Sequence, residues 1–313
     1  MTPASRQPST QAGTTVSPTP GRASGRAWAA LGIVYVVWGS TYLAIRIAVE
    51  TMPPFLSAAA RFITAGLLLA ALVAWRQGPA ALRVTRHQLA SAALVGLMLL
   101  LGGNGLVVLA EQSVPSGLAA LLVAAVPLWV VLLRRATGQR TSGTTIAGVL
   151  VGLLGLVVLT VPGLSGQVKL AGVLTVIGAT VMWSGGSFLA SRLPMPGSAL
   201  AASAYEMIAG GLGCLALAAL RGEPQALDLS AISTRSWLAL AYLVVFGSLI
   251  AFTAYAWLLQ SAPLPLVSTY AYVNPVVAVF LGWLILDEPL TWPILVGGAI
   301  VVGGVCLVVR TER

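Results

Sequence analysis

The stretch Trp38-Gly39-Ser40-Thr41-Tyr42-Leu43-Ala44-Ile45-Arg46 lies in the first long apolar segment of the chain. A second version of it is Trp183-Ser184-Gly185-Gly186-Ser187-Phe188-Leu189-Ala190-Ser191-Arg192. Both begin with Trp, pass through small and hydroxylated residues to an aromatic residue followed by Leu-Ala, and end at Arg. Apolar segments that carry this much Gly, Ser and Thr favour close helix contact or a polar neighbour. The repetition predicts a duplicated membrane protein whose working residues lie where the two halves meet.

The composition indicates the class of protein. Apolar residues make up 58% of the 313 residues and charged residues only 8%, whereas an ordinary soluble domain is about 25% charged. Many apolar runs are roughly 18 to 22 residues long, enough for a helix to cross a hydrocarbon core of about 30 Å. Such helices satisfy their own backbone hydrogen bonds, which lipid cannot do. We therefore expect an all-α polytopic membrane protein with the lipid bilayer as its surroundings.

Several other functions are excluded by residue type and placement. The net charge is +9, but the basic residues lie in short loops and form no basic face interleaved with aromatic residues, so nucleic acid is not an expected partner. Cys214 and Cys306 each lie inside an apolar segment, and His87 is the only histidine. These residues are too few for a zinc site or a Cys-His nucleophile. We expect no metal, no cofactor and no catalytic residue.

Ten membrane spans are predicted after a disordered cytoplasmic tail. Residues 1–27 form the tail, because they are rich in Ser, Thr, Pro, Gly and Ala and contain no apolar core. The predicted spans are 28–48, 55–75, 89–110, 115–133, 144–161, 170–190, 199–219, 237–258, 264–286 and 292–309.

The charged residues predict the orientation of these spans. Ten spans place both termini on one side of the membrane. If that side is the cytoplasm, most of the 17 basic residues face inward, as the positive-inside rule requires. The acidic loop residues then face outward, with Glu111 among them in the loop that follows the third span. Both termini are therefore expected to be cytoplasmic.

An internal repeat relates the two halves of the chain. Four sets of residues recur in the same order at nearly constant spacing. They are Arg61 to Gly66 with Glu206 to Gly211, Gln112 to Pro115 with Gln260 to Pro263, Val126-Pro127 with Asn274-Pro275, and Gly148 and Gly155 with Gly297 and Gly304. Each half, 28–161 and 170–309, holds five spans, so the halves must cross the membrane in opposite directions. Inverted repeats are typical of transporters, with the substrate site near mid-membrane at their interface.

Two ionisable residues lie inside predicted spans, where charge is costly and usually functional. Arg61 and Glu206 occupy equivalent positions of the two repeats. Three interpretations are open: the two side chains pair across the interface, Arg61 reaches the outer surface as a local anchor, or one of them has a direct substrate or proton role.

Polar and aromatic residues of several spans are the candidates for substrate binding. Helical spacing places Trp38, Thr41 and Tyr42 on one face, and likewise Trp183 with Ser187 and Tyr270 with Asn274. Tyr255 and Asn104 add one polar group each from two further spans. Aromatic walls with a few hydrogen-bonding groups suit small amphipathic molecules. The alternative for any single Trp or Tyr is a packing or interfacial role.

The prolines within two spans admit two interpretations. Pro127 and Pro275 each leave one carbonyl of the preceding turn without its helical donor. In a transporter such a proline can mark a hinge or a cavity wall, although proline kinks are also ordinary in membrane helices.

These residues resemble the EamA-type members of the drug/metabolite transporter superfamily, over nearly the whole chain after residue 27. The resemblance is carried by Trp38-Gly39-Ser40-Thr41-Tyr42, Pro53-Pro54, Ala60-Arg61-Phe62, Gly103-Asn104-Gly105-Leu106, Val114 to Ala120, Tyr270 to Val276 and Asp287-Glu288-Pro289-Leu290. It implies ten helices in two inverted five-helix repeats, and export of amino acids, related metabolites or xenobiotics through a central cavity. The acidic residue that family repeats often carry between their last two helices is Glu288 here, whereas the first repeat has Gln139. We therefore expect Glu288 to cap a loop.

The sequence thus predicts a secondary transporter of the bacterial inner (plasma) membrane. It is expected to export small amphipathic metabolites by alternating access around a central cavity, with a small molecule as its partner. Proton coupling, with Glu206 as the main candidate, and the oligomeric state stay open. The alternatives are a channel or facilitator and a structural membrane protein that transports nothing. A membrane enzyme is not expected, because the spans contain no clustered His/Asp, Glu/His or Ser-Lys set.

Overall fold

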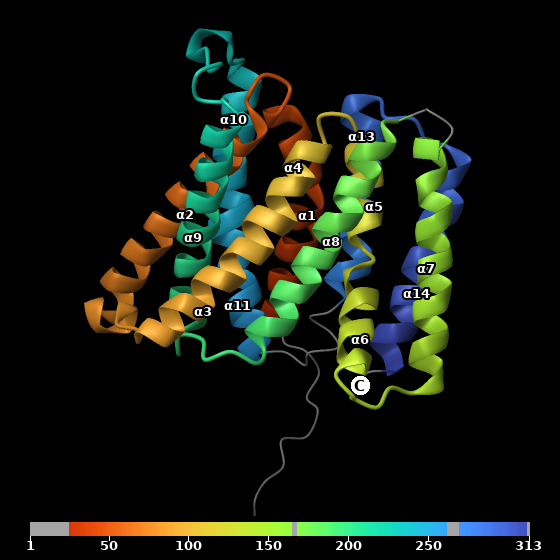
Figure 1. Cartoon of the computed structure of the whole chain (residues 1–313), viewed down its shortest axis with the longest axis horizontal. Helices are drawn as coiled ribbons and strands as arrows, with labels where there is room; N and C mark the ends of the chain where they lie inside the picture. The colour runs from red at the N-terminus through yellow and green to blue at the C-terminus, as the bar shows by residue number, and fades with distance from the viewer. Residues whose placement is uncertain (1–24, 165–167, 262–268, 312–313) are drawn as a thin grey trace, which may run out of the picture.

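The computed structural model describes residues 25–164, 168–261 and 269–311, and within them every regular element is helical. Figure 1 shows the helices side by side. In chain order the elements are α1 (Gly25–Ala48), α2 (Pro54–Gln77), η1 (Pro79–Leu82), α3 (Arg86–Gly96), η2 (Leu97–Gly105), α4 (Leu106–Ala110), α5 (Ser116–Val123), α6 (Val126–Ala136), α7 (Gly143–Leu164), α8 (Leu170–Ala190), α9 (Ala199–Leu220), η3 (Leu229–Ala231), α10 (Thr234–Tyr242), η4 (Leu243–Ile250), α11 (Ala251–Ser261), α13 (Tyr270–Leu286) and α14 (Trp292–Thr311).

The described helices confirm a polytopic membrane protein. Nine stretches in this part of the chain are long and apolar enough to cross a membrane, and they coincide closely with nine of the predicted spans. The predicted span 264–286 corresponds to α13, a shorter apolar helix of 17 residues. The first part of that predicted span lies outside the described residues, so the count of ten stays a prediction. At the other end, α1 begins at Gly25, so the last residues of the predicted tail are helical.

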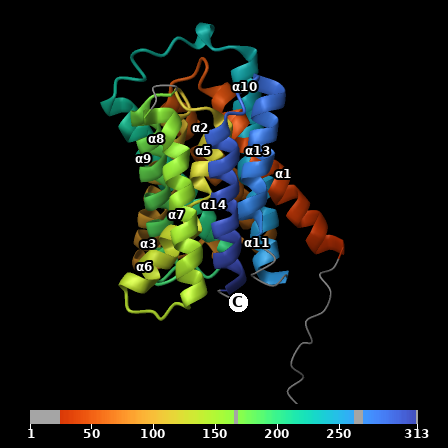
Figure 2. The ribbon, with the colours of Figure 1, turned by 90° about the vertical axis from the view of Figure 1, so that its right-hand side faces the viewer.

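The two ends of the described chain lie on the same side of the molecule. Figure 2 shows the first residues of α1 and the end of α14 at its lower edge, with the loop before α10 at the upper edge. An even number of crossings places both ends of a chain on one side.

Large side chains on the outer faces are exposed, as Leu150, Leu154 and Val157 are along α7. Such an apolar surface suits contact with lipid.

Three of the spans are interrupted by irregular backbone. The third contains the π-helical η2, and the eighth contains the π-helical η4. The fourth is divided into α5 and α6 just before Pro127, because a proline lacks the N–H that would continue the helix and clashes with the preceding turn. Pro275, by contrast, lies inside the continuous α13. The two equivalent prolines therefore have different effects on the backbone.

Glycines bring two pairs of helices into close contact. A Cβ at Gly304 of α14 would lie 2.7 Å from the carbonyl oxygen of Gly148 in α7, and one at Gly155 of α7 would lie 2.9 Å from the carbonyl oxygen of Gly297. The helices α2 and α9 pack similarly, with Gly66 against Ile208 and Gly211 against Ile63. These contacts allow backbones to approach closely, as small residues do in membrane bundles. In each pair of helices the contacts are reciprocal, because a glycine of the first helix meets the second helix and a glycine of the second helix meets the first.

Two carboxylates cap helices that lie far from them in sequence. Glu288 accepts hydrogen bonds from the backbone N–H groups of Ser116 (2.6 Å) and Gly117 (2.9 Å), at the start of α5. Glu223 accepts in the same way from Phe55 (3.4 Å) and Leu56 (2.9 Å), near the start of α2. The first N–H groups of a helix have no intrahelical partner, and negative charge is favourable there. Glu288 was expected to cap a loop, and it caps the start of the helix α5 instead.

Replacing the Glu288 carboxylate by an amide should weaken this cap. In Glu288→Gln one oxygen remains to accept and the charge is lost, so we expect a loss of about 1–2 kcal/mol of stability. The neighbouring Asp287→Asn is the matched control, because Asp287 is exposed and is the C-cap residue of α13, where its left-handed backbone also suits Asn. Thermal unfolding of the purified proteins in detergent compares the two. An equal loss in both would contradict a specific cap at α5.

Candidate functional site

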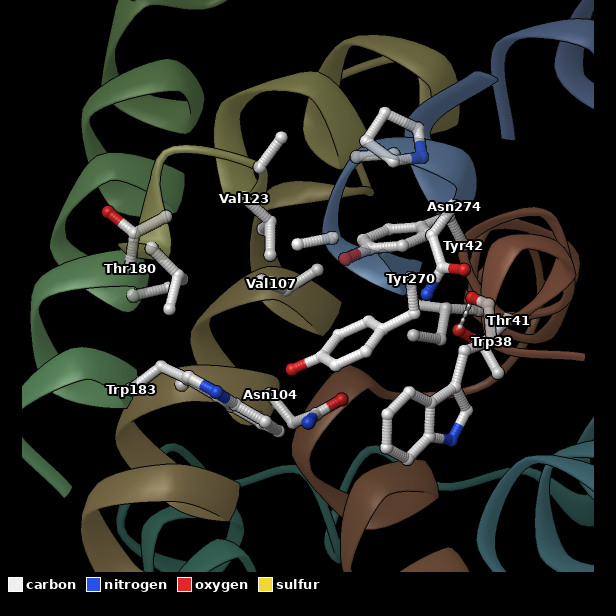
Figure 3. A pocket seen from close by; sticks show the side chains of 18 of the residues that line it. Trp38, Thr41, Tyr42, Asn104, Val107, Val123, Thr180, Trp183, Tyr270 and Asn274 are labelled. Carbon is white, nitrogen blue, oxygen red and sulfur yellow. Dashed lines mark hydrogen bonds between the residues drawn. The ribbon is translucent and has the colours of Figure 1, made fainter. Parts of the chain in front are cut away.

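A cavity of about 150 Å³ lies at the centre of the bundle. Its walls come from α1, η2, α4, α5, α6, α8 and α13, with Arg61 of α2 and Phe252 of α11. In Figure 3, Thr41, Tyr42, Tyr270 and Asn274 lie on one side of the space, and Thr180 and Trp183 lie on the opposite side. The break between α5 and α6 contributes Ala124, and the first turn of α6 contributes Val126 and Pro127. The cavity is thus formed by helices from both halves of the chain.

Seven of the nine residues predicted to bind substrate line this cavity. They are Trp38, Thr41, Tyr42, Asn104, Trp183, Tyr270 and Asn274. The other two lie elsewhere. Tyr255 packs behind the wall, with its ring 5.0 Å from that of Trp38 and 5.7 Å from that of Tyr270. Ser187 donates to the carbonyl of Trp183 and lines a separate hollow beside Arg134 and Arg192, so it does not share a space with Trp183.

Trp38 is the centre of the aromatic wall. Its ring lies 5.5 Å from Phe252 and 5.3 Å from Tyr270, in edge-on arrangements that aromatic pairs prefer. Its indole Nε1 donates to the carbonyl of Gly247, at 3.2 Å. Gly247 belongs to the π-helical η4. Trp38 therefore joins α1 to η4, α11 and α13.

Some polar side chains that line the cavity already form hydrogen bonds within the protein, and others do not. Thr41 donates to the carbonyl of Trp38 within its own helix, at 2.6 Å. The amide nitrogen of Asn274 is placed to donate to the carbonyls of Tyr270 (3.2 Å) and Tyr35 (3.3 Å), which ties α13 to α1. The Asn104 side chain makes no hydrogen bond with the rest of the described chain and lies between Trp38 and Trp183 in Figure 3. Asn104 is thus the amide that is free to meet a ligand.

Arg61 lines the cavity although only 5% of its surface is exposed. Its Nε donates to the hydroxyl of Ser248, at 3.1 Å, and its guanidinium lies 4.9 Å from the ring of Phe62. Its Nη1 has no hydrogen-bond partner in the described part of the protein. A buried cation with an unused donor can bind an anionic group by donating a hydrogen bond to it.

Glu206, which one of the three interpretations paired with Arg61, lies elsewhere in the bundle. Between Arg61 and Glu206 there is no ion pair: Glu206 has its backbone against Gly96 of α3, whereas Arg61 is directed toward η4. The repeat placed the two residues on equivalent helices. It did not determine the direction of their side chains, which depends on how α2 and α9 are rotated in the bundle.

The burial of the Glu111 carboxylate was not predicted from the sequence. Glu111 follows the span that ends at Ala110, where a surface loop was expected, yet its exposed fraction is 0%. Neither of its carboxylate oxygens has a hydrogen-bond partner among the described residues. Arg46 donates to its backbone carbonyl instead. Its position beside an apolar run was the only signal in the sequence, since the residues that cover it come from distant segments.

The model of the EamA-like transporter family matches residues 26–161 and, a second time, residues 170–310. These two matches cover most of the chain. The chain belongs to this family.

Relatives of this EamA-family chain have transporter names. It is 42% identical over 256 residues to the uncharacterized inner membrane transporter YedA of Escherichia coli K12, with 81% of this chain and 80% of the relative covered. It is 26% identical over 289 residues to a probable amino-acid metabolite efflux pump of the same organism, with 87% and 91% covered. A solved crystal structure matches with a TM-score of 0.61 and 22% identity, over 92% of this chain and 98% of the other. That likeness concerns the fold alone.

Family and structure together establish the general function. An EamA-family chain with nine candidate spans in its described residues is a multi-pass membrane transporter. Its location is the inner membrane, as for the YedA relative.

Proposed function

We propose that this chain is a secondary transporter that exports small amphipathic metabolites, above all amino acids and related carboxylates, by alternating access around the central cavity. One observation carries the proposal. The cavity has aromatic walls and contains a buried cation, Arg61, whose Nη1 is without a partner in the described chain. The name of the efflux-pump relative supports the same class of substrate. Xenobiotics with the same chemistry are a further group of solutes.

The architecture we propose is two inverted repeats of five spans, over residues 28–161 and 170–309, with both termini in the cytoplasm. The reciprocal glycine contacts support it, because a two-fold relation pairs each residue with the equivalent of its partner. The family model matches twice over nearly the same ranges. The π-helical η2 and η4 lie in the third and eighth spans, which would be equivalent in such a repeat. Rocking of one repeat against the other would open the cavity to either side in turn.

The cavity residues would divide the work of binding between them. Trp38, Tyr42, Trp183 and Tyr270 would hold the apolar part of the solute, with Tyr255 supporting the ring of Trp38. Asn104 and the free lone pair of Thr41 would form hydrogen bonds. Arg61 would bind a carboxylate through its planar donors.

The remaining candidates would act outside direct binding. Asn274 would hold α13 against α1. Ser187 would lie on the route from the hollow at the end of α8. Glu206 stays a candidate for coupling, although it does not pair with Arg61.

An export assay tests this proposal. Cells with and without the protein are loaded with a metabolite panel that includes leucine and leucinamide, which differ in the carboxylate. Arg61→Gln is expected to lower export of the carboxylate member about tenfold or more, because a charge-assisted hydrogen bond contributes about 1.5–3 kcal/mol. Arg76→Gln, an exposed arginine on the same helix, is the control.

Two results would contradict the proposal. If no member of the panel leaves the cell faster when the protein is present, it is not an exporter of this class. If Arg61→Gln lowers export of both solutes equally, Arg61 does not bind the carboxylate. Ionic currents far above the turnover of a carrier would indicate a channel instead.

A further inference from the structure

Glu111 has charged and polar neighbours in two separate spaces. Two of them, Tyr42 and Arg61, line the central cavity. The other two, Arg46 and Glu288, line a second hollow of about 440 Å³ at the end of the bundle where α5 begins. All four interact electrostatically with Glu111. The buried carboxyl thus lies within electrostatic reach of both spaces.

The charged groups around Glu111 form their hydrogen bonds with other partners. Arg46 donates to the backbone carbonyl of Glu111, Arg61 donates to Ser248, and the carboxylate of Glu288 accepts from the start of α5. None of these contacts reaches the oxygens of the Glu111 carboxyl. An ionised carboxylate that is buried without hydrogen bonds is strongly disfavoured and tends to become neutral. Burial, together with the charge of Glu288, raises the pKa of Glu111 well above its usual range, while Arg46 and Arg61 oppose this shift.

The other buried acid of the described chain shows what a structural carboxylate does in this fold. Glu223 is 8% exposed and accepts two backbone N–H groups at the start of α2. Glu111 accepts none, although it is more deeply buried. A capping role therefore does not account for Glu111.

We propose that Glu111 is a proton-binding site linked to the charge of Arg61. The ionised carboxylate takes a proton from a hydronium ion and releases water, and no other group is consumed. While Glu111 is ionised, it attracts Arg61 and competes with an anionic solute for it. When Glu111 holds its proton, Arg61 is free to bind the solute. Protons and carboxylates then favour each other's binding, since coupling between two sites is reciprocal.

The proton site can be tested without any solute. Infrared difference spectra of the purified full chain, recorded above about pH 6, where exposed carboxyl groups are ionised, are expected to show the signal of a carboxyl group that is still protonated. Glu111→Gln should remove that signal, whereas Glu223→Gln should retain it. Persistence of the signal in Glu111→Gln would overturn the proposal, and its loss in Glu206→Gln alone would assign the proton to Glu206. Glu111→Asp keeps an acid at the position and should still titrate, which covers the case in which the glutamine variant does not fold.

The link to Arg61 is tested by the midpoint of the same titration. Arg61→Gln removes a cation that favours the ionised form, so the midpoint should rise by about one pH unit or more. Arg76→Gln should leave it unchanged. An unchanged midpoint in Arg61→Gln would show that the two groups are not linked.

A stability measurement provides an independent readout. Because the pKa is raised in the folded protein, the wild type should be stabilised at low pH and lose stability as the pH rises through that pKa. Glu111→Gln should lose less stability over the same range. A wild-type and variant pair with identical pH profiles would count against the proton site.

The solute part of the proposal rests on the proposed function, and the titration does not. Lower pH should strengthen binding of a carboxylate solute, and Glu111→Gln should abolish this pH dependence. If export fails but the titration behaves as expected, the transport proposal is wrong and the proton site stands. If leucine is exported but the titration signal persists in Glu111→Gln, the reverse holds.

Discussion

Gly304→Leu is expected to destabilise the protein by about 3 kcal/mol or more, whereas Gly303→Leu, one position earlier, is expected to be tolerated. A Cβ at Gly304 would lie 2.5 Å from the backbone nitrogen of Gly152 and 2.7 Å from the carbonyl oxygen of Gly148. Both are backbone atoms of α7, which cannot turn aside as a flexible side chain can. Overpacking of a core typically costs about 1–3 kcal/mol, and here we expect the upper end of that range or more.

The control for this substitution lies in the same helix. A Cβ at Gly303 would meet no atom within 4 Å, so a leucine there adds an apolar side chain without a clash. The yield of monodisperse protein and its thermal unfolding in detergent compare the two variants. Equal stability of the two would show that α7 and α14 do not pack through Gly304. Figure 1 shows these two helices side by side at one end of the bundle.

Trp38→Ala is expected to lower export at least tenfold and to destabilise the protein by about 3 kcal/mol. The substitution removes three ring contacts and the hydrogen bond to Gly247. It also enlarges the cavity on the side that joins α1 to the eighth and ninth spans. Trp28→Ala is the matched control, since Trp28 belongs to the same helix and is 54% exposed.

The two effects of Trp38→Ala are separated by measuring export and stability in the same preparation. Export of the panel solute per folded molecule should fall in Trp38→Ala and stay near the wild-type value in Trp28→Ala. A loss of export that merely follows the amount of folded protein would indicate a packing role for Trp38, the alternative that the sequence left open.

The candidate site could be predicted in large part because membrane helices follow simple spacing rules. Residues three, four and seven apart share a helix face, so Trp38, Thr41 and Tyr42 were placed together correctly. Trp183 and Ser187 are four residues apart and share a helix face by the same rule, but they line different spaces. A shared helix face says nothing about where a cavity ends along the helix.

The class of protein and the positions of nine spans were determined by the sequence alone. A hydrocarbon core demands long apolar helices, and little else can satisfy the backbone in lipid. Tertiary structure decided how each helix is rotated and what covers its ends. It directed Arg61 to Ser248 and away from Glu206, divided the fourth span at Pro127, and buried Glu111 beneath groups from distant segments. Those outcomes depend on contacts between segments far apart in the chain, and local composition does not encode them.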